Sequence, residues 1–144
     1  MAKISFPHSS HSEEIFKVQK RISRIIMNLS KKASCWQPFR ELNIPPVPSQ
    51  YILSLLLFIT RNKDQFISNS QVHKITIRRS SDLYVPAANL TIYRKGVYYQ
   101  GIKIYSRVPK TIKELSGDKN KFKLALKSYL TRNCFCSLKE YFDT

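Results

Sequence analysis

The sequence is poor in acidic residues and has no long hydrophobic run. Nine Asp and Glu stand against 25 Lys and Arg in 144 residues, so the formal net charge is +16. Because such an imbalance attracts polyanions, we expect a nucleic acid or an anionic membrane surface as the partner. The longest apolar run, residues 51–59, contains Ser54 and is far shorter than the roughly 20 residues of a membrane-spanning helix. A membrane is therefore the weaker expectation, and we predict none.

Cysteine is also scarce, and its pattern favours an intracellular protein. Cys35, Cys134 and Cys136 are odd in number, which fits reduced thiols and not a disulfide framework. The spacing of the last two does not fit a zinc knuckle, and Cys35 and His73 are too distant in the chain to complete a recognisable set. The first residues contain no apolar core of a secretory signal. We expect a nuclear or cytoplasmic location, no metal and no cofactor.

Residues that would support catalysis are missing as well. Two-metal nucleotidyl transfer needs paired carboxylates, and the chain has no Asp-Asp pair. The histidines have no nucleophile at a suggestive spacing. A phosphate-binding loop requires Lys directly after its second glycine, followed by Ser or Thr, whereas Ile102 separates Gly101 from Lys103 and no hydroxyl follows. We therefore predict that this chain is not an enzyme.

What the sequence does contain is enough apolar material for a core. Hydrophobic residues make up 42% of the chain and aromatic ones 12%, too much for a disordered basic tail. The length fits one domain. We predict a flexible lead-in over residues 1–11 and a single basic helical domain over residues 12–144. The expected fold class is mainly α with a small antiparallel β-hairpin, an α+β arrangement.

The first predicted element is an amphipathic helix that begins at Ser12 as its N-cap. Glu13 and Glu14 follow where the helix dipole favours acids. No Glu lies four residues after any cation of the basic stripe to neutralise it, so the stripe is either a solvated outer face or a set of phosphate contacts. The apolar residues at helical spacing are Ile15, Val18, Ile22, Ile25, Ile26 and Leu29, and the basic residues opposite are Lys17, Lys20, Arg21 and Arg24.

The next segment predicts a rigid connector and a buried helix. A short helix is expected near Pro38 to Leu42, and the prolines at 45, 46 and 48 prevent it from continuing. The helix expected over residues 49–62 is hydrophobic on most sides, which indicates a central place in the core.

A short β-hairpin is predicted after this helix. Residues 73–78 alternate between His or Ile and Lys, Thr or Arg, the period of a strand. Residues 83–86 and 90–93 are the expected pairing partners.

Helices are predicted again in the last third. Residues 96–105 fit either a strand, from the alternation at 102–105, or a short helix that ends before Val108-Pro109, and we favour the helix. A polar link runs through Gly117. A further helix is expected over residues 119–133, followed by one or two helical turns after Phe135.

The stretch from Arg94 to Lys113 combines cations with flat rings and contains no acidic residue. Cations contact phosphates and aromatic rings stack on bases, so this composition is typical of a nucleic-acid surface. Tyr105 precedes the proline turn and is expected to pack inside. The cations are Arg94, Lys95, Lys103, Arg107, Lys110 and Lys113, and the stacking candidates are Tyr98 and Tyr99.

Four segments, in order, resemble the C-terminal segment of reverse transcriptases from jockey-like non-LTR retrotransposons. They cover about residues 13 to 143. FKVQKRISRII at 16–26 resembles the family's Phe-x-x-Gln-Lys-Arg-x-x-Arg-Ile-Ile helix, and SCWQPFRELNIPPVPSQYI at 34–52 resembles Ser-Cys-x-x-x-Phe-x-x-Leu-x-Ile-x-x-x-Pro-Ser-x-Tyr-Ile. The third is 73–78, where HKITIR stands for His-x-Tyr-Asn-Thr-Arg. The fourth runs from YQGIK at 99–103 through Pro109 to Phe122-Lys123 and LKEYF at 138–142.

The resemblance implies a part of an RNA-directed DNA polymerase from a transposable element. In that family the palm with its catalytic aspartates and the endonuclease lie upstream, and this region lies at or beyond the thumb. It implies a non-catalytic fragment that holds template RNA, primer or target DNA, with the upstream domains as further partners. Our alternative is a structural or interaction module that packs on the thumb without binding nucleic acid itself. The predicted nucleic-acid contacts are Lys17, Lys20, Arg21, Arg24, Arg78, Arg79, Tyr98, Tyr99, Lys103 and Arg107.

Overall fold

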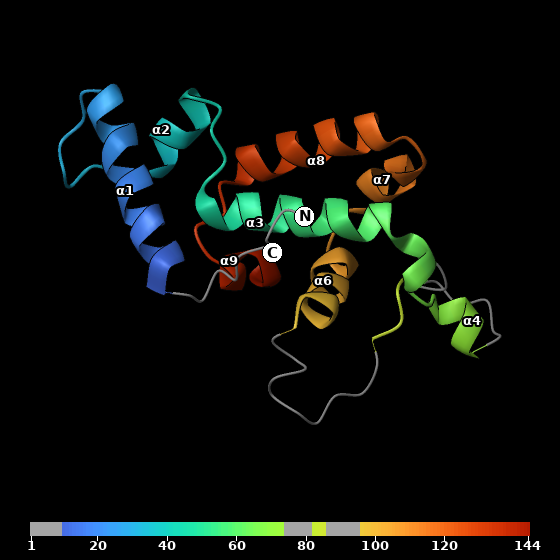
Figure 1. Cartoon of the computed structure of the whole chain (residues 1–144). Helices are drawn as coiled ribbons and strands as arrows, with labels where there is room; N and C mark the ends of the chain where they lie inside the picture. The colour runs from blue at the N-terminus through green and yellow to red at the C-terminus, as the bar shows by residue number, and fades with distance from the viewer. Residues whose placement is uncertain (1–9, 74–81, 86–95) are drawn as a thin grey trace.

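The computed structural model describes residues 10–73, 82–85 and 96–144, and this part of the chain is mainly helical (Figure 1). Two short 3₁₀ turns, Lys63–Gln65 and Glu114–Gly117, connect helices. The helices are α1 (Ser10–Ile26), α2 (Trp36–Glu41), α3 (Val47–Arg61), α4 (Asn69–His73), α6 (Val97–Ser106), α7 (Lys110–Lys113), α8 (Lys119–Asn133) and α9 (Leu138–Asp143).

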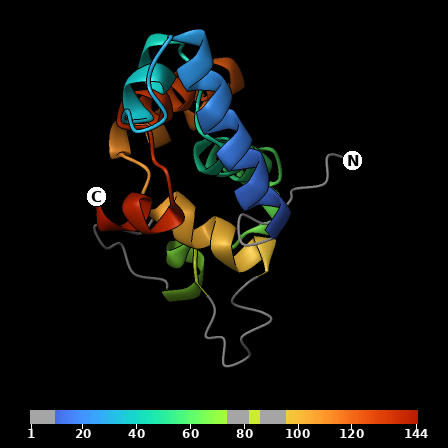
Figure 2. The same cartoon turned by 90° about the vertical axis from the view of Figure 1, so that its left-hand side faces the viewer.

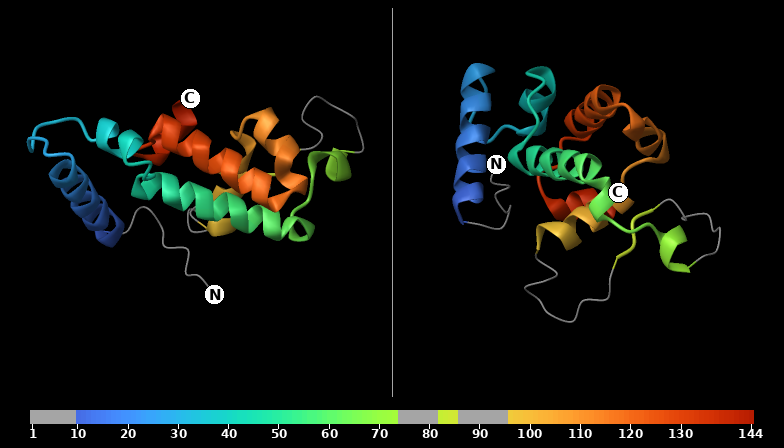
Figure 3. Two further views of the ribbon diagram at one scale, coloured as in Figure 1. Left: turned by 90° about the horizontal axis from the view of Figure 1, so that it is seen from above. Right: turned by 45° about the vertical axis from the view of Figure 1, so that its right-hand side comes forward.

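Helix α3 forms the centre of the molecule. Helix α8 runs along one side of it, α6 crosses another side, and α1 and α2 lie at one end with α4 at the other (Figures 1 and 3). Ile52, Leu55 and Leu56 of α3 are fully buried, as the nearly continuous apolar sequence predicts. Pro46 and Val47-Pro48 begin the helix, where missing N–H donors cost nothing. The predicted central core helix is therefore confirmed.

Helix α8 packs on α3 through a regular apolar row. Phe122, Leu126 and Leu130 recur at helical spacing and are completely buried. The Asp118 carboxylate caps the helix by accepting hydrogen bonds from the backbone N–H groups of Asn120 and Lys121 at 3.0 and 3.2 Å. The sequence predicted this helix with its observed bounds.

Helix α6 approaches α3 closely because of a glycine. A Cβ atom at Gly101 would lie 2.7 Å from Cδ1 of Ile59 and 3.6 Å from Cγ of Leu55. Ile102 and Ile104 of α6 are buried in the same core, and Tyr105 is buried as predicted. The helix expected over 96–105 is confirmed.

Several predicted boundaries are wrong. Helix α1 begins at Ser10, so Ser10 and His11 are not part of a flexible lead-in, and Ser12 lies buried inside the helix instead of capping it. The polar link before Gly117 contains α7 and a 3₁₀ turn, which the Pro109 N-cap and the buried Ile112 explain.

The predicted β-hairpin is not found in the described part of the chain. His73 ends helix α4 instead of starting a strand, and Leu83 pairs with Ser68 in an isolated antiparallel bridge. The remaining hairpin residues at 74–78, 86 and 90–93 lie outside the described residues. The mainly helical class is confirmed, and the β component stays a prediction.

Helix α1 lies along one side of the molecule (Figure 2) and contacts the rest of the protein through an unexpected face. Phe16 stacks on Phe39 of α2 with ring centroids 6.2 Å apart. The Gln19 side chain donates to the Pro45 carbonyl at 3.1 Å and accepts from the Val47 N–H at 2.9 Å, and Ser23 is buried. The apolar face that normally packs inward is exposed: Ile15 is 59% and Ile25 66% accessible. The contacts of α1 are therefore made by a face between the apolar and basic faces.

Candidate nucleic-acid interface

The predicted cations on α1 divide into two exposed and two tethered side chains. Lys17 and Arg21 are exposed and have no acidic partner among the described residues. The Lys20 ammonium lies 4.5 Å from the centroid of the Phe16 ring, a cation–π contact. Arg24 donates from Nε to the Ala33 carbonyl at 2.9 Å, which holds the end of α1 against the following loop. Lys17 and Arg21 are thus the α1 cations best placed to meet a phosphate.

The predicted residues on α6 are partly used by the fold. Tyr98 stacks on Phe66 with centroids 4.7 Å apart and an interplanar angle of 8°, so one face of its ring is covered. Lys103 lies 5.2 Å from the Tyr99 ring centroid. Lys103 and Arg107 are exposed. A base that stacks on Tyr98 must therefore use the ring face away from Phe66.

The two predicted groups belong to different parts of the molecule. Helix α1 lies at the end beside α2, whereas α6 packs on α3 (Figure 1). The remaining predicted contacts, Arg78 and Arg79, lie outside the described residues. A polyanion that met both α1 and α6 would have to follow the surface of the protein.

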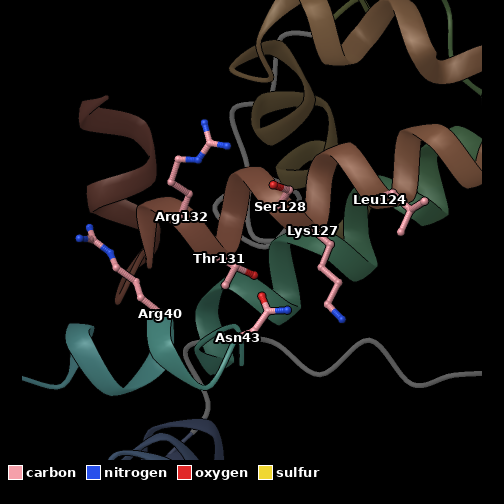
Figure 4. A pocket seen from close by; sticks show the side chains of 7 residues that line it. All are labelled: Arg40, Asn43, Leu124, Lys127, Ser128, Thr131 and Arg132. Atoms are coloured by element: carbon pink, nitrogen blue, oxygen red, sulfur yellow. The ribbon is translucent and has the colours of Figure 1, made fainter.

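A third basic site, which the sequence did not predict, lies between α2 and α8. Its volume is about 530 Å³. Figure 4 shows Thr131 and Asn43 opposite each other between the two helices, with Lys127 to one side and Arg40 and Arg132 to the other. No acidic residue lines it. The lining residues, which we call the α2–α8 pocket, are Arg40, Asn43, Leu124, Lys127, Ser128, Thr131 and Arg132.

The hydroxyl of Thr131 is a buried polar group of this pocket. Thr131 is only 6% accessible, and its Oγ1 has no hydrogen-bond partner. Near the pocket, burial raises the pKa of the Cys134 thiol, an effect that the Arg40 guanidinium beside the thiol opposes. Arg40, Lys127 and Arg132 form no ion pair with a described residue.

Acidic neighbours neutralise few of the described cations. Lys113 bonds Asp82 at 2.8 Å, and Lys121 lies 3.8 Å from Asp118. No other Lys or Arg within the described ranges has a carboxylate within 4.0 Å. Most of the described positive charge is therefore not neutralised by a direct ion pair.

The cysteines form a small thiol cluster near Trp36. Trp36 donates from Nε1 to Sγ of Cys136 at 2.9 Å, and burial raises the pKa of Cys136 to about 12, helped by the nearby Cys35 thiol. Over residues 10–73, 82–85 and 96–144, no group of three His, Cys, Asp or Glu residues is placed to hold a metal ion.

An apolar groove runs along the exposed face of α1. It has a volume of about 250 Å³, and Ile44 from the loop after α2 also lines it. The described helices include none with the length and apolar character needed to cross a membrane. The groove is lined by Ile15, Val18, Gln19, Ile22, Ser23, Ile26 and Ile44.

Comparisons of the chain with protein-family models, curated proteins and solved structures find no match. The resemblance to the reverse transcriptase segment therefore stays a prediction that rests on the four ordered motifs.

One sequence signal could have indicated the α2–α8 pocket. On α8 the positions 124, 127, 128 and 131 form a second face, and three of them are polar or basic although they adjoin a buried row. The contribution of α2 had no such signal, because Arg40 and Asn43 lie far from α8 in the chain.

Proposed function

We propose that this chain is a non-catalytic nucleic-acid-binding module that holds RNA or DNA through contacts to phosphates. The observation that carries the proposal is a charge of +16 whose described cations have few acidic partners. Phosphate contacts dominate the affinity of such proteins because each one releases condensed counterions. The resemblance to the end of a reverse transcriptase supports template, primer or target DNA as the ligand.

The exposed basic face of α1 provides the sharpest test. Lys17→Gln together with Arg21→Gln removes two unpaired charges from α1. We expect weaker binding and a salt slope that is shallower by about 1.4 on a single strand and about 1.8 on a duplex. The measurement is the fluorescence anisotropy of labelled RNA, single-stranded DNA and duplex, titrated between about 50 and 200 mM salt.

A matched control removes the same charge elsewhere. Lys119→Gln with Lys121→Gln acts on the first turn of α8, at the other end of the molecule from α1 (Figure 1). We expect a smaller change in slope, because Lys121 already faces Asp118. The proposal fails if no nucleic acid binds at low salt and micromolar protein. The assignment to α1 fails if both double variants change the slope equally.

A second candidate function is a protein-interaction module, and the exposed face of α1 favours it. Residues 15, 18, 22 and 25 are apolar and follow the alternating three- and four-residue spacing of a coiled-coil seam. The partner element that fits this spacing is an amphipathic helix. This candidate is supported over the first if light scattering shows that the chain self-associates and the same titrations detect no binding of nucleic acid.

A further inference from the structure

We propose that the α2–α8 pocket is a binding site for the terminal phosphate of a nucleic-acid strand. The pocket has three cationic side chains, Arg40, Lys127 and Arg132, and no acidic one. Like charges around one cavity repel each other, and a bound anion removes that repulsion. The choice of ligand rests on the proposed function, whereas the anion site itself is tested separately below.

The polar groups of the pocket supply the hydrogen bonds that a phosphate needs. Arg40 and Arg132 carry planar guanidinium groups, which match phosphate oxygens in pairs. In Figure 4 both groups point away from Thr131 and Asn43, so these long side chains must turn to meet a ligand there. Ser128 and Asn43 add neutral donors from α8 and from the turn after α2. Thr131 adds a buried hydroxyl without a partner, and buried polar groups of proteins are rarely left so. The Oγ1 atom is itself buried, so a ligand oxygen would become its acceptor only after a small movement of the pocket wall.

The fold holds the two sides of the pocket in place independently of any ligand. Phe39 anchors α2 in the core, and Leu126 and Leu130 anchor α8, all with no accessible surface. Asn43 adopts a left-handed conformation with φ 54°, and the following Ile44 N–H bonds the Phe39 carbonyl at 3.0 Å. This turn ends α2 and places the Asn43 side chain in the pocket. The fold thus fixes the backbone on both sides of the pocket.

Size and charge favour a strand end over an internal phosphodiester. A volume of about 530 Å³ exceeds the need of one phosphate and lies in the range of small-ligand sites. The exposed Leu124 at one side offers an apolar contact for the attached sugar or base. A terminal phosphate carries a charge of about −1.5 to −2, which matches several cations better than the single charge of a diester.

The first experiment compares two oligonucleotides of one sequence, one with a 5′-phosphate and one with a 5′-hydroxyl. A second pair carries the phosphate at the 3′ end. We expect one phosphorylated end to raise the affinity about tenfold or more, as charge-assisted hydrogen bonds imply. Thr131→Val, which keeps the side-chain shape, and Arg132→Gln should each reduce this preference. Lys119→Gln, outside the pocket, should leave it unchanged.

The second experiment needs no oligonucleotide. We expect adenosine monophosphate to raise the thermal unfolding midpoint, adenosine to have no effect, and Thr131→Val to abolish the shift. Thr131→Val should itself fold at least as stably, because it removes an unpaired buried hydroxyl.

The outcomes separate the two proposals. Oligonucleotides that bind equally with and without a terminal phosphate overturn the strand-end site but leave the general nucleic-acid proposal standing. If no oligonucleotide binds but adenosine monophosphate stabilises the protein through Thr131, the pocket stands as an anion site and the proposed function fails. Equal stabilisation by sulfate and by adenosine monophosphate overturns the nucleotide assignment.

Discussion

At the scale of single residues, buried polar groups with defined partners join α9 to the core. Tyr141 is 1% accessible, and its hydroxyl donates to the Ile104 carbonyl at 2.9 Å. Its ring meets Phe135 edge-on with centroids 5.2 Å apart. Burial raises the pKa of Tyr141 well above the ordinary value of 10.0. The hydroxyl therefore stays protonated in the folded protein when a solvated tyrosine has already ionised.

Tyr141→Phe should destabilise the protein near neutral pH, and this destabilisation should disappear at alkaline pH. Loss of the hydrogen bond should cost about 0.5–1.5 kcal/mol of stability. The cost stays modest because the Ile104 carbonyl still accepts a hydrogen bond from the Arg107 N–H. Above pH 10 the unfolded tyrosine ionises and the folded one does not, so wild-type stability falls by up to about 1.4 kcal/mol per pH unit relative to the variant. Urea unfolding of both proteins from neutral pH to about pH 11 measures the difference. Parallel stability curves would contradict the assignment.

At the scale of elements, the contact between α3 and α6 depends on one missing side chain. Gly101 lies against Ile59, which is 1% accessible. A glycine inside a helix is unfavourable by roughly 0.5–1 kcal/mol relative to alanine. The close approach of α3 and α6 explains why position 101 is glycine and not alanine.

Gly101→Ala and Ile59→Val should therefore couple favourably. The new Cβ collides with Cδ1 of Ile59, and the valine lacks that atom. Overpacking typically costs about 1–3 kcal/mol, so the double variant should be more stable than the sum of the two single effects by more than about 0.5 kcal/mol. Urea unfolding of the wild type, both single variants and the double variant completes the cycle. Additive effects would show that α6 shifts without cost.

At the scale of the whole molecule, unneutralised charge opposes folding. The net charge of +16 and the few ion pairs in the described part of the chain predict self-repulsion that salt screens. Lys119→Glu with Lys121→Glu changes the charge by two at each position, so the net charge falls from +16 to +12. The two acids also lie at the N-terminus of α8, where the helix dipole favours them.

We expect the wild type to gain stability with added salt and this variant to gain less. The screening length falls to about 10 Å at 0.1 M salt, so most of the effect should be complete there. The measurement is the thermal unfolding midpoint of both proteins at several concentrations of sodium chloride. Chloride is used because it lacks the geometry of phosphate. A wild-type midpoint that is independent of salt would show that the cations are too far apart to repel.

Much of the fold was predictable because its signals are local. Helix α8 was predicted with its bounds, since its apolar row, which includes Phe122, Leu126 and Leu130, follows helical spacing within one short segment. The core position of α3 followed from its composition. Helix α4 and α7 were missed because each is too short to show a period, and their conformation depends on contacts such as that of Ile112 with the core. Of the proposed sites, the cations on α1 and α6 were predicted and the α2–α8 pocket was not.

The sequence alone determined the helical class and the central helix, because hydrophobic periodicity and composition depend on residues that are neighbours in the chain. It also determined the large positive charge, which is a sum over the charged residues. It also determined that Phe16, Gln19 and Ser23 share one face of α1. Only the tertiary structure decided that this face packs and that the isoleucines stay outside, because the choice depends on Phe39 and Pro45 from another segment. The pocket has the same origin. Its two sides are brought together only when α2 and α8 pack at the same end of α3.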